Sequence, residues 1–187
     1  MDGVKSRQRS RQSRGWLHPP ARATHDVMTD SSTRSLQETF ALSGRCFGCG
    51  PANDKGLRIR SFPTEDAADA HVVCDFTPEK HHEAFEGVLN GGIIGTVLDC
   101  HMNWTTIFHL MKKNGLDHAP CCVTAEFKVV LKRPTPLGPV HVEAHVVSSS
   151  ADRATIEATM TAGGKITAIG SGTFVAVKPD HPAYHRW

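Results

Sequence analysis

The chain has 187 residues, a formal net charge of +2 and 39% hydrophobic residues. This length suits one domain with tails and suffices to bury a core. The near-neutral charge argues against a general polyanion-binding role, and no apolar run reaches the ~18 residues that a membrane-spanning helix needs. Six cysteines without the pattern of a small secreted domain favour reduced thiols and a cytoplasmic location, with no membrane partner.

Residues 1–36 differ in composition from the rest of the chain. Basic residues lie there among Ser, Gln and Pro with little apolar periodicity, which is typical of an unfolded arm. A transit peptide, a nucleic-acid arm and an extension upstream of a natural start at Met28 are the alternatives. We expect a disordered basic tail over 1–36, one folded domain over 37–178 and a C-terminal tail over 179–187, without a nucleic-acid partner.

Cys46 and Cys49 form a Cys-x-x-Cys pair in a glycine-rich segment. Such a pair supplies half of a tetrahedral zinc site, and the other ligands would have to come from elsewhere, such as His81 and His82 or a second subunit. A redox pair is another interpretation. The flanking glycines suit a tight turn equally well. We therefore expect a structural loop and no metal.

The segment before residue 90 predicts two strands and a loop. Residues 57–62 indicate a first strand, and residues 72–76 alternate between apolar and polar types as expected for a second. The loop over 77–89 contains His81, His82 and Phe85. It leads directly to a pair of glycines.

A long apolar helix begins at this pair, Gly91 and Gly92, and is expected to run to about Lys113, before an Asn-Gly stop signal. Its circumference is mostly apolar, which predicts burial. One polar stripe, with members three and four residues apart, shares a single face. The stripe consists of Gly92, Thr96, Asp99, Asn103 and Thr106. A carboxylate on a buried helix is costly unless it is paired, so Asp99 is the leading candidate for a functional residue.

The start of this helix and Asp99 are too far apart to act together on one small group. Unpaired amides and the helix dipole make a helix N-terminus suitable for a developing negative charge. Seven residues separate Gly92 from Asp99, a rise of about 10 Å. If both act on one substrate, a second copy of the helix must lie antiparallel to the first. The sequence thus predicts a dimer with a shared site.

Four strands are predicted after the helix. In residues 123–131 the apolar side chains of Val123, Ala125 and Phe127 alternate along one face, and further strands are expected over 140–146, 154–160 and 166–177. An antiparallel sheet that wraps a single buried helix covers all these elements economically. The predicted fold class is therefore α+β.

Four motifs occur in order along the chain: CFGCGPANDKGL (residues 46–57), FEGVLNGGII (85–94), VLD (97–99) and RPTPLG (133–138). Together they resemble the PaaI-type branch of the hotdog-fold thioesterases, within the 4-hydroxybenzoyl-CoA thioesterase-like superfamily. The resemblance covers about residues 45–177. It implies a hotdog fold, a homodimer or dimer of dimers, and hydrolysis of acyl-CoA thioesters between subunits, with no metal or other cofactor.

The resemblance also implies roles for individual residues. Asp99 matches a helix acid that acts as general base or nucleophile, and Gly92 matches a glycine whose N–H polarises the thioester carbonyl. Thr124 lies where relatives carry a Ser or Thr that helps to hold the attacking water. The substrate-binding candidates are Gly91, His81, His82, Phe85, Asn103, Lys132 and Arg133. Of these, the histidines fall in a loop near the acyl group, and the basic pair falls in a region that can meet the CoA phosphates.

Asn90 and Cys100 depart from the family pattern, which usually has His before the two glycines and often an acid after the Asp. Asparagine is a good N-cap and its amide can donate to a carbonyl oxygen, so Asn90 stays a catalytic candidate, but it cannot carry a proton. We expect an acyl-CoA thioesterase. A non-catalytic hotdog protein that binds an acyl ligand is the alternative, and a hydratase or dehydratase would need a loop signature that the sequence lacks.

Overall fold

The computed structural model describes Met1 and residues 34–64 and 71–184. The predicted N-terminal tail therefore lies mostly outside the described residues, as does the end of the predicted C-terminal tail at 185–187. The chain divides into two units between Asp30 and Ser31, and the fold below is that of the second unit. In the described part of the chain, no helix is both long enough and apolar enough to span a membrane.

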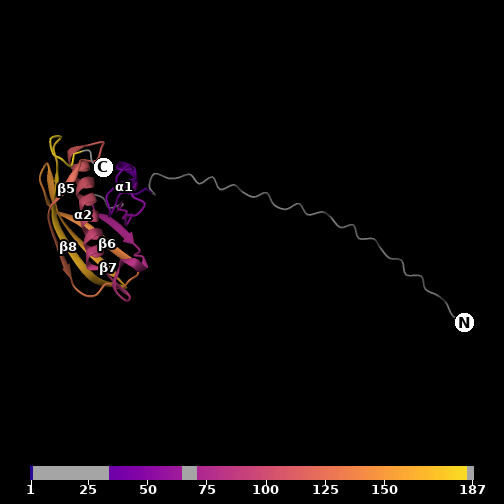
Figure 1. The fold of residues 1–187 in the computed structure, drawn as a ribbon. Helices are drawn as coiled ribbons and strands as arrows, with labels where there is room; N and C mark the ends of the chain where they lie inside the picture. The colour runs from indigo at the N-terminus through magenta and orange to yellow at the C-terminus, as the bar shows by residue number, and fades with distance from the viewer. Residues whose placement is uncertain (2–33, 65–70, 185–187) are drawn as a thin grey trace. The chain divides into compact units, whose positions relative to one another are not determined.

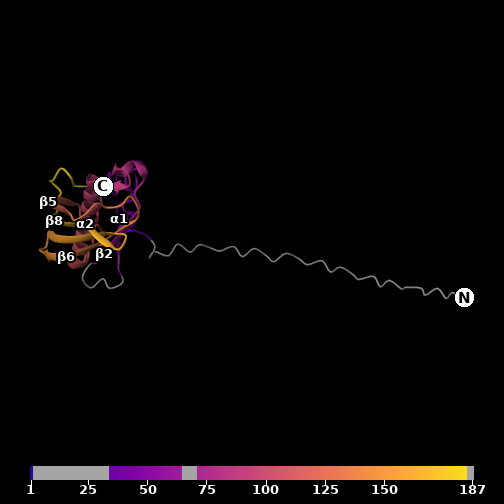
Figure 2. The ribbon, with the colours of Figure 1, turned by 90° about the horizontal axis from the view of Figure 1, so that it is seen from below.

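One long helix lies against an antiparallel sheet. The elements follow in the order α1 (Leu36–Phe40), β1 (Phe62–Pro63), β2 (Val72–Phe76), the 3-10 helix η3 (Lys80–His82), β3 (Glu83–Phe85), β4 (Val88–Leu89), α2 (Gly91–Asn114), β5 (Cys122–Leu131), β6 (Val140–Ser149), β7 (Arg153–Ala162) and β8 (Lys165–Ala176). The six-stranded sheet has the order β1-β2-β6-β7-β8-β5, and β3 pairs with β4 alone. Figures 1 and 2 show α2 in the curve of this sheet, which confirms the predicted α+β architecture.

Local signals set both ends of α2. The side chain of Asn90 accepts a hydrogen bond from the Gly92 amide at 2.7 Å, as an N-cap residue does. At the other end Gly115 has φ of 62°, and its N–H closes the last turn on the carbonyls of Met111 and Lys112. This left-handed conformation favours glycine. The helix therefore extends one residue beyond the predicted Lys113.

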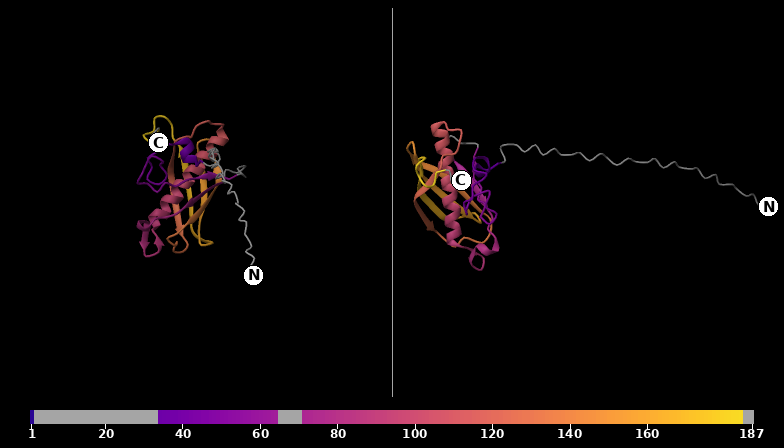
Figure 3. Two further views of the ribbon diagram at one scale, coloured as in Figure 1. Left: turned by 90° about the vertical axis from the view of Figure 1, so that its right-hand side faces the viewer. Right: turned by 45° about the horizontal axis from the view of Figure 1, so that its top comes forward.

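The core lies between α2 and the sheet. Apolar side chains on one face of β6, β7 and β8, such as Val142, Ile156 and Phe174, are fully buried with those of the helix. Each large apolar side chain buried in this way contributes about 1.5–3 kcal/mol. Gly170 of β8 allows close approach, because an added Cβ would lie 3.0 Å from the Met102 methyl carbon. Figure 3 shows α2 crossing the strands that it covers.

A buried chain of hydrogen bonds joins α1 to α2 and β2. The Gln37 amide donates to the Ser61 hydroxyl at 3.0 Å, and this hydroxyl lies 2.9 Å from His101 Nδ1. His101 Nε2 lies 3.0 Å from the Val72 carbonyl oxygen, which can only accept, so Nε2 carries the proton and Nδ1 accepts from Ser61. Burial lowers the pKa of His101 to about 4, in keeping with a neutral ring.

Two segments before α2 differ from the sequence prediction. Leu57 and Ile59 are buried, but they belong to a loop rather than a strand, because their amides bond to the carbonyls of Phe47 and Gly48 at 2.8 and 3.0 Å. Only Phe62 and Pro63 form the short β1. The predicted loop over 77–89 contains η3 and the β3–β4 hairpin.

A β-bulge near the start of β5 reverses the predicted side-chain alternation there. Thr124 pairs with Phe174 and Glu126 with Thr173, so Ala125 is the extra residue. Cross-strand partners share a face, and Phe174 points into the core, so Thr124 faces α2. Phe127 also faces α2, whereas regular alternation would have placed Thr124 on the opposite side from Phe127.

Candidate active site

The structure brings three predicted catalytic residues to one open groove between α2 and β5. Gly92, Asp99 and Thr124 line it together with Gly95, Thr96 and Phe127. The Thr124 hydroxyl donates a hydrogen bond to Asp99 Oδ1 at 2.8 Å. This bond depends on the bulge, which turns Thr124 toward the helix. The groove therefore presents a carboxylate whose orientation is fixed by a neighbouring strand.

The environment of Asp99 favours its protonated form more than water does. Partial burial raises the pKa of the Asp99 carboxyl, the Thr124 hydrogen bond opposes this shift, and negative charge on Cys46 adds to it. A carboxylate with a raised pKa is a stronger base than an ordinary aspartate. Asp99 is therefore suited to accept a proton from a bound nucleophile.

The Gly92 amide has a hydrogen-bond acceptor within the chain. Its N–H donates to Asn90 Oδ1 at 2.7 Å, so the cap engages the group that was predicted to polarise a substrate carbonyl. The other amides of the first turn, those of Gly91 and Ile93, are of the kind that a helix leaves without intrahelical partners. A substrate oxygen at this end of α2 must use these amides or displace the Asn90 side chain.

Four of the predicted substrate-binding residues line a second cavity, of about 390 Å³, beside the start of α2. They are Phe85, Gly91, Lys132 and Arg133. The Phe85 side chain is 75% exposed there, at the tip of the β3–β4 hairpin. An apolar ring and two cations at one cavity suit a ligand with an apolar part and an anionic part.

His81 and His82 lie elsewhere. The structure places neither among the residues that line the groove or the cavity. His82 is 7% exposed, and its Nδ1 accepts a hydrogen bond from the Glu79 amide at 3.0 Å. Burial, and to a smaller extent the positive charge of the nearby His81, lower the pKa of His82. The His82 carbonyl accepts from the Asn90 amide at 2.9 Å. His82 therefore helps to position the residue that caps the start of α2.

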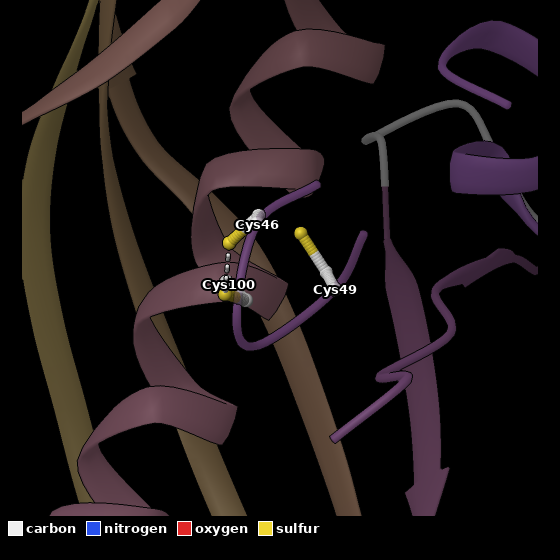
Figure 4. A group of neighbouring side chains, drawn as sticks. All are labelled: Cys46, Cys49 and Cys100. Atoms are coloured by element: carbon white, nitrogen blue, oxygen red, sulfur yellow. Dashed lines mark hydrogen bonds between the residues drawn. The ribbon is translucent and has the colours of Figure 1, made fainter. Parts of the chain in front are cut away.

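A third cavity, of about 420 Å³, lies on another side of Asp99. Asn103, the remaining predicted residue, lines it beside Cys46, Cys49 and Cys100. The three sulfur atoms all lie within 4.8 Å of one another (Figure 4). Sequence reasoning noted the Cys-x-x-Cys pair but sought its partners among the histidines. The position of Cys100 next to Asp99 on the predicted helix was the sequence signal that could have indicated a third cysteine in this cluster.

The architecture is the hotdog fold, which confirms the predicted fold class. No protein-family model matches the sequence, and no curated protein matches it either. Solved structures share the fold. A putative thioesterase from Ralstonia eutropha JMP134, a phenylacetic acid degradation-related protein, is 18% identical with a TM-score of 0.56, over 67% of this chain and 89% of its own.

Two further structures give the same result. Zebra fish thioesterase superfamily member 2 is 20% identical with a TM-score of 0.53, over 67% of this chain and 90% of its own. A Bacillus halodurans protein whose structure was solved with CoA is 21% identical with a TM-score of 0.53, over 65% of this chain and 76% of its own. The chain thus shares its fold with proteins of the thioesterase superfamily, as its motifs predicted.

Proposed function

We propose that the protein hydrolyses acyl-CoA thioesters to a free acid and CoA. The observation that carries this proposal is the open groove in which the Asp99 carboxylate is held by a hydrogen bond from Thr124. The fold, shared with thioesterase-superfamily structures, supports it. So does the related Bacillus halodurans structure solved with CoA.

The mechanism uses a carboxylate and backbone amides. Asp99 draws a proton from water as the water oxygen attacks the thioester carbon, or Asp99 attacks that carbon itself. Thr124 keeps the carboxylate in position. The carbonyl oxygen takes up negative charge near the amides at the start of α2 in a second copy of the chain, which contribute about 10²–10³-fold per donor. In the first route the carbon–sulfur bond then breaks, and the CoA thiolate receives the proton held by Asp99. In the second route the carbon–sulfur bond breaks to leave an anhydride between Asp99 and the acyl group. Water hydrolyses this anhydride to the free acid and the Asp99 carboxylate, and the acid proton passes to the CoA thiolate.

The proposed site is shared between two copies of the chain. A rise of about 10 Å separates Gly92 from Asp99 along the helix, too far for both to meet one carbonyl. The strand β5 is at one end of the sheet, so its outer edge is open to pairing with another chain. Near that edge Val130 and Leu131 are 38% and 55% exposed. An antiparallel partner along β5 would cover them, giving a homodimer or a dimer of dimers.

The cavity with Lys132 and Arg133 is the proposed site for CoA. Phosphate groups of CoA are anionic, and lysine and arginine bind phosphate through charge-assisted hydrogen bonds. Gly91 lines the same cavity and directly precedes Gly92, which lines the groove. CoA bound there would therefore direct its acyl thioester toward the start of α2.

One observation favours a second function, the binding of an acyl ligand without hydrolysis. Asn90 stands where the family that the sequence resembles usually has histidine, and its side-chain oxygen accepts a hydrogen bond from the Gly92 amide. If the cap stays closed when ligand binds, the carbonyl loses that donor. The protein would then hold an acyl group and release no thiol.

The test is thiol release from short, medium, long and aromatic acyl-CoAs. Asp99→Asn should lower kcat/KM by roughly 10²-fold or more, in the range of general-base catalysis. The control is Asp117→Asn, which changes an exposed carboxylate in the loop after α2. Full hydrolysis of every acyl-CoA by Asp99→Asn would refute the mechanism. Saturable binding of acyl-CoA by the wild type without thiol release would favour the second function, and a large gain in rate with Asn90→His would show that the natural residue weakens an enzyme.

A further inference from the structure

Three cysteine sulfur atoms lie close together where the loop before β1 packs against α2. Cys46 and Cys49 come from the loop and Cys100 from the helix, as Figure 4 shows. Cys46 Sγ and Cys100 Sγ are 3.8 Å apart, and all three sulfurs lie within 4.8 Å of one another. The structure records these cysteines as free thiols. Residues more than fifty positions apart in sequence are thus held within reach of one small ion.

The spacing of the sulfurs suits a tetrahedral metal. Zinc–sulfur bonds of about 2.3 Å place two sulfur ligands of a tetrahedron about 3.8 Å apart. The Cys46–Cys100 separation is already 3.8 Å. The other sulfurs, within 4.8 Å, need to move by about 1 Å at most to reach the same spacing.

The loop is shaped so that its sulfurs face the helix. An added Cβ at Gly48 would overlap the Cys100 sulfur and lie 2.8 Å from a Thr96 carbon, so only glycine permits this approach. At Gly50 an added Cβ would lie 2.5 Å from the Cys46 amide nitrogen. The Gly50 amide donates to the Cys46 carbonyl at 2.9 Å and closes the turn. The Cys-x-x-Cys turn is therefore fixed before any ion binds.

Donor groups surround the sulfurs in a way that suits thiolates. The Trp104 indole N–H donates to Cys49 Sγ at 3.3 Å. The Cys46 and Cys100 sulfurs are within hydrogen-bond distance, at 3.8 Å. Hydrogen bonding with the side chains of Cys100 and Cys49, followed by the backbone of Cys49 and Gly48, lowers the pKa of the Cys46 thiol against the effect of burial. Hydrogen bonding with Cys46 and Cys49, and then burial, raise the pKa of the Cys100 thiol. The Cys100 side chain lowers the pKa of Cys49, but hydrogen bonding with Cys46 and burial raise it to about 12. A divalent cation stabilises the thiolate form of each cysteine that coordinates it.

We propose that Cys46, Cys49 and Cys100 bind one zinc ion through three thiolate sulfurs. Three sulfur–zinc bonds form, and each thiol that becomes a ligand releases its proton to solvent. Cys46 is exposed, which gives the ion a path to the site. This inference differs from the expectation of a metal-free loop, because the sequence alone did not place Cys100 beside the pair.

The fourth ligand of the ion is water from the adjoining cavity. The three cysteines line that cavity together with Asn103. Within the described part of the chain, Asn103 Oδ1 is buried and has no hydrogen-bond partner. A zinc-bound water is a donor that can satisfy it. The site is complete within one chain and does not depend on the proposed hydrolysis.

The test is metal binding by the reduced, untagged full-length protein. Zinc content after dialysis should be about one ion per chain, and titration with Co²⁺ should give the ultraviolet charge-transfer band of thiolate ligands and the visible bands of tetrahedral cobalt. Competition with a chromophoric chelator measures the zinc affinity. Cys100→Ser should weaken it by roughly 100-fold or more, because each ligand supplies a large share of the binding energy. Cys74→Ala, which changes a buried cysteine of β2 outside the cluster, should leave the affinity unchanged.

The wild-type cobalt spectrum keeps the proposal testable even where Cys100→Ser fails to fold. Absence of a thiolate-to-cobalt band in the folded, reduced wild type would overturn the site. So would zinc binding that Cys100→Ser leaves intact in a folded variant. Loss of zinc from Cys46→Ser and Cys49→Ser, with Cys74→Ala unaffected, would support it, whether or not the protein hydrolyses any acyl-CoA.

Discussion

Ser61→Ala should destabilise the domain far more than the loss of a surface hydroxyl would. The Ser61 hydroxyl accepts from the Gln37 amide and donates to His101, and all three side chains are fully buried. Alanine leaves one donor and one acceptor unpaired, each at a cost of about 1–3 kcal/mol, so the free energy of unfolding should fall by about 2–6 kcal/mol. At about 2–4 °C per kcal/mol for a chain of this size, Tm should fall by roughly 4–24 °C.

Urea unfolding followed by circular dichroism measures this loss directly. The matched control is Ser148→Ala, because Ser148 is an exposed serine on β6 and its substitution should change the free energy by no more than about 0.5 kcal/mol. A Ser61→Ala variant as stable as this control would show that the buried chain of hydrogen bonds does not form as described.

Two further changes test other contacts. Gly48→Ala should lower the free energy of unfolding by about 1–3 kcal/mol, because the added Cβ would overlap the Cys100 sulfur. The control is Gly138→Ala, which should be near neutral because no atom lies within 4 Å of the added Cβ. Equal effects of the two substitutions in urea unfolding would contradict the close packing of the loop against α2. The hydrogen bond to Asp75 raises the pKa of His141 in the folded protein. The pair therefore stabilises the fold fully at pH values below the pKa that His141 has in the unfolded chain, and this stabilisation is lost as the pH rises through its pKa in the folded protein. His141→Gln should therefore lower Tm at about pH 5.5 and much less at about pH 9, and a Tm difference that does not change with pH would refute this linkage.

The elements that the sequence predicted best are those specified by neighbouring residues. Asn90 and Gly115 mark the ends of α2 through contacts within a few residues of each end. The apolar alternation of β6 and β7 sufficed for their assignment because each has one regularly buried face. The polar face of α2 likewise led to Asp99, and the structure places it in an open groove with Thr124.

What sequence reasoning missed depends on contacts between distant segments. Leu57 and Ile59 have apolar spacing that fits a strand, but the amide bonds of a loop hold them, and no local pattern shows that choice. The approach of Cys46 to Cys100 depends on Gly48, whose missing side chain matters only once the loop packs on the helix. The role of His82 near the acyl group, which the family resemblance implies, stays a prediction; within the chain its Nδ1 accepts a hydrogen bond from the Glu79 amide.

The extra residue in β5 makes the candidate site more sensitive to chain length than to side-chain identity at that point. Ala125 is exposed, so many residue types can replace it without touching the groove. Deletion of that one residue would restore regular alternation and turn the Thr124 hydroxyl to the outer side of the sheet, away from Asp99. Point substitutions at position 125 should therefore have little effect on the candidate site, whereas deletion of this one residue would separate the Asp99 carboxylate from its hydrogen-bond donor, Thr124.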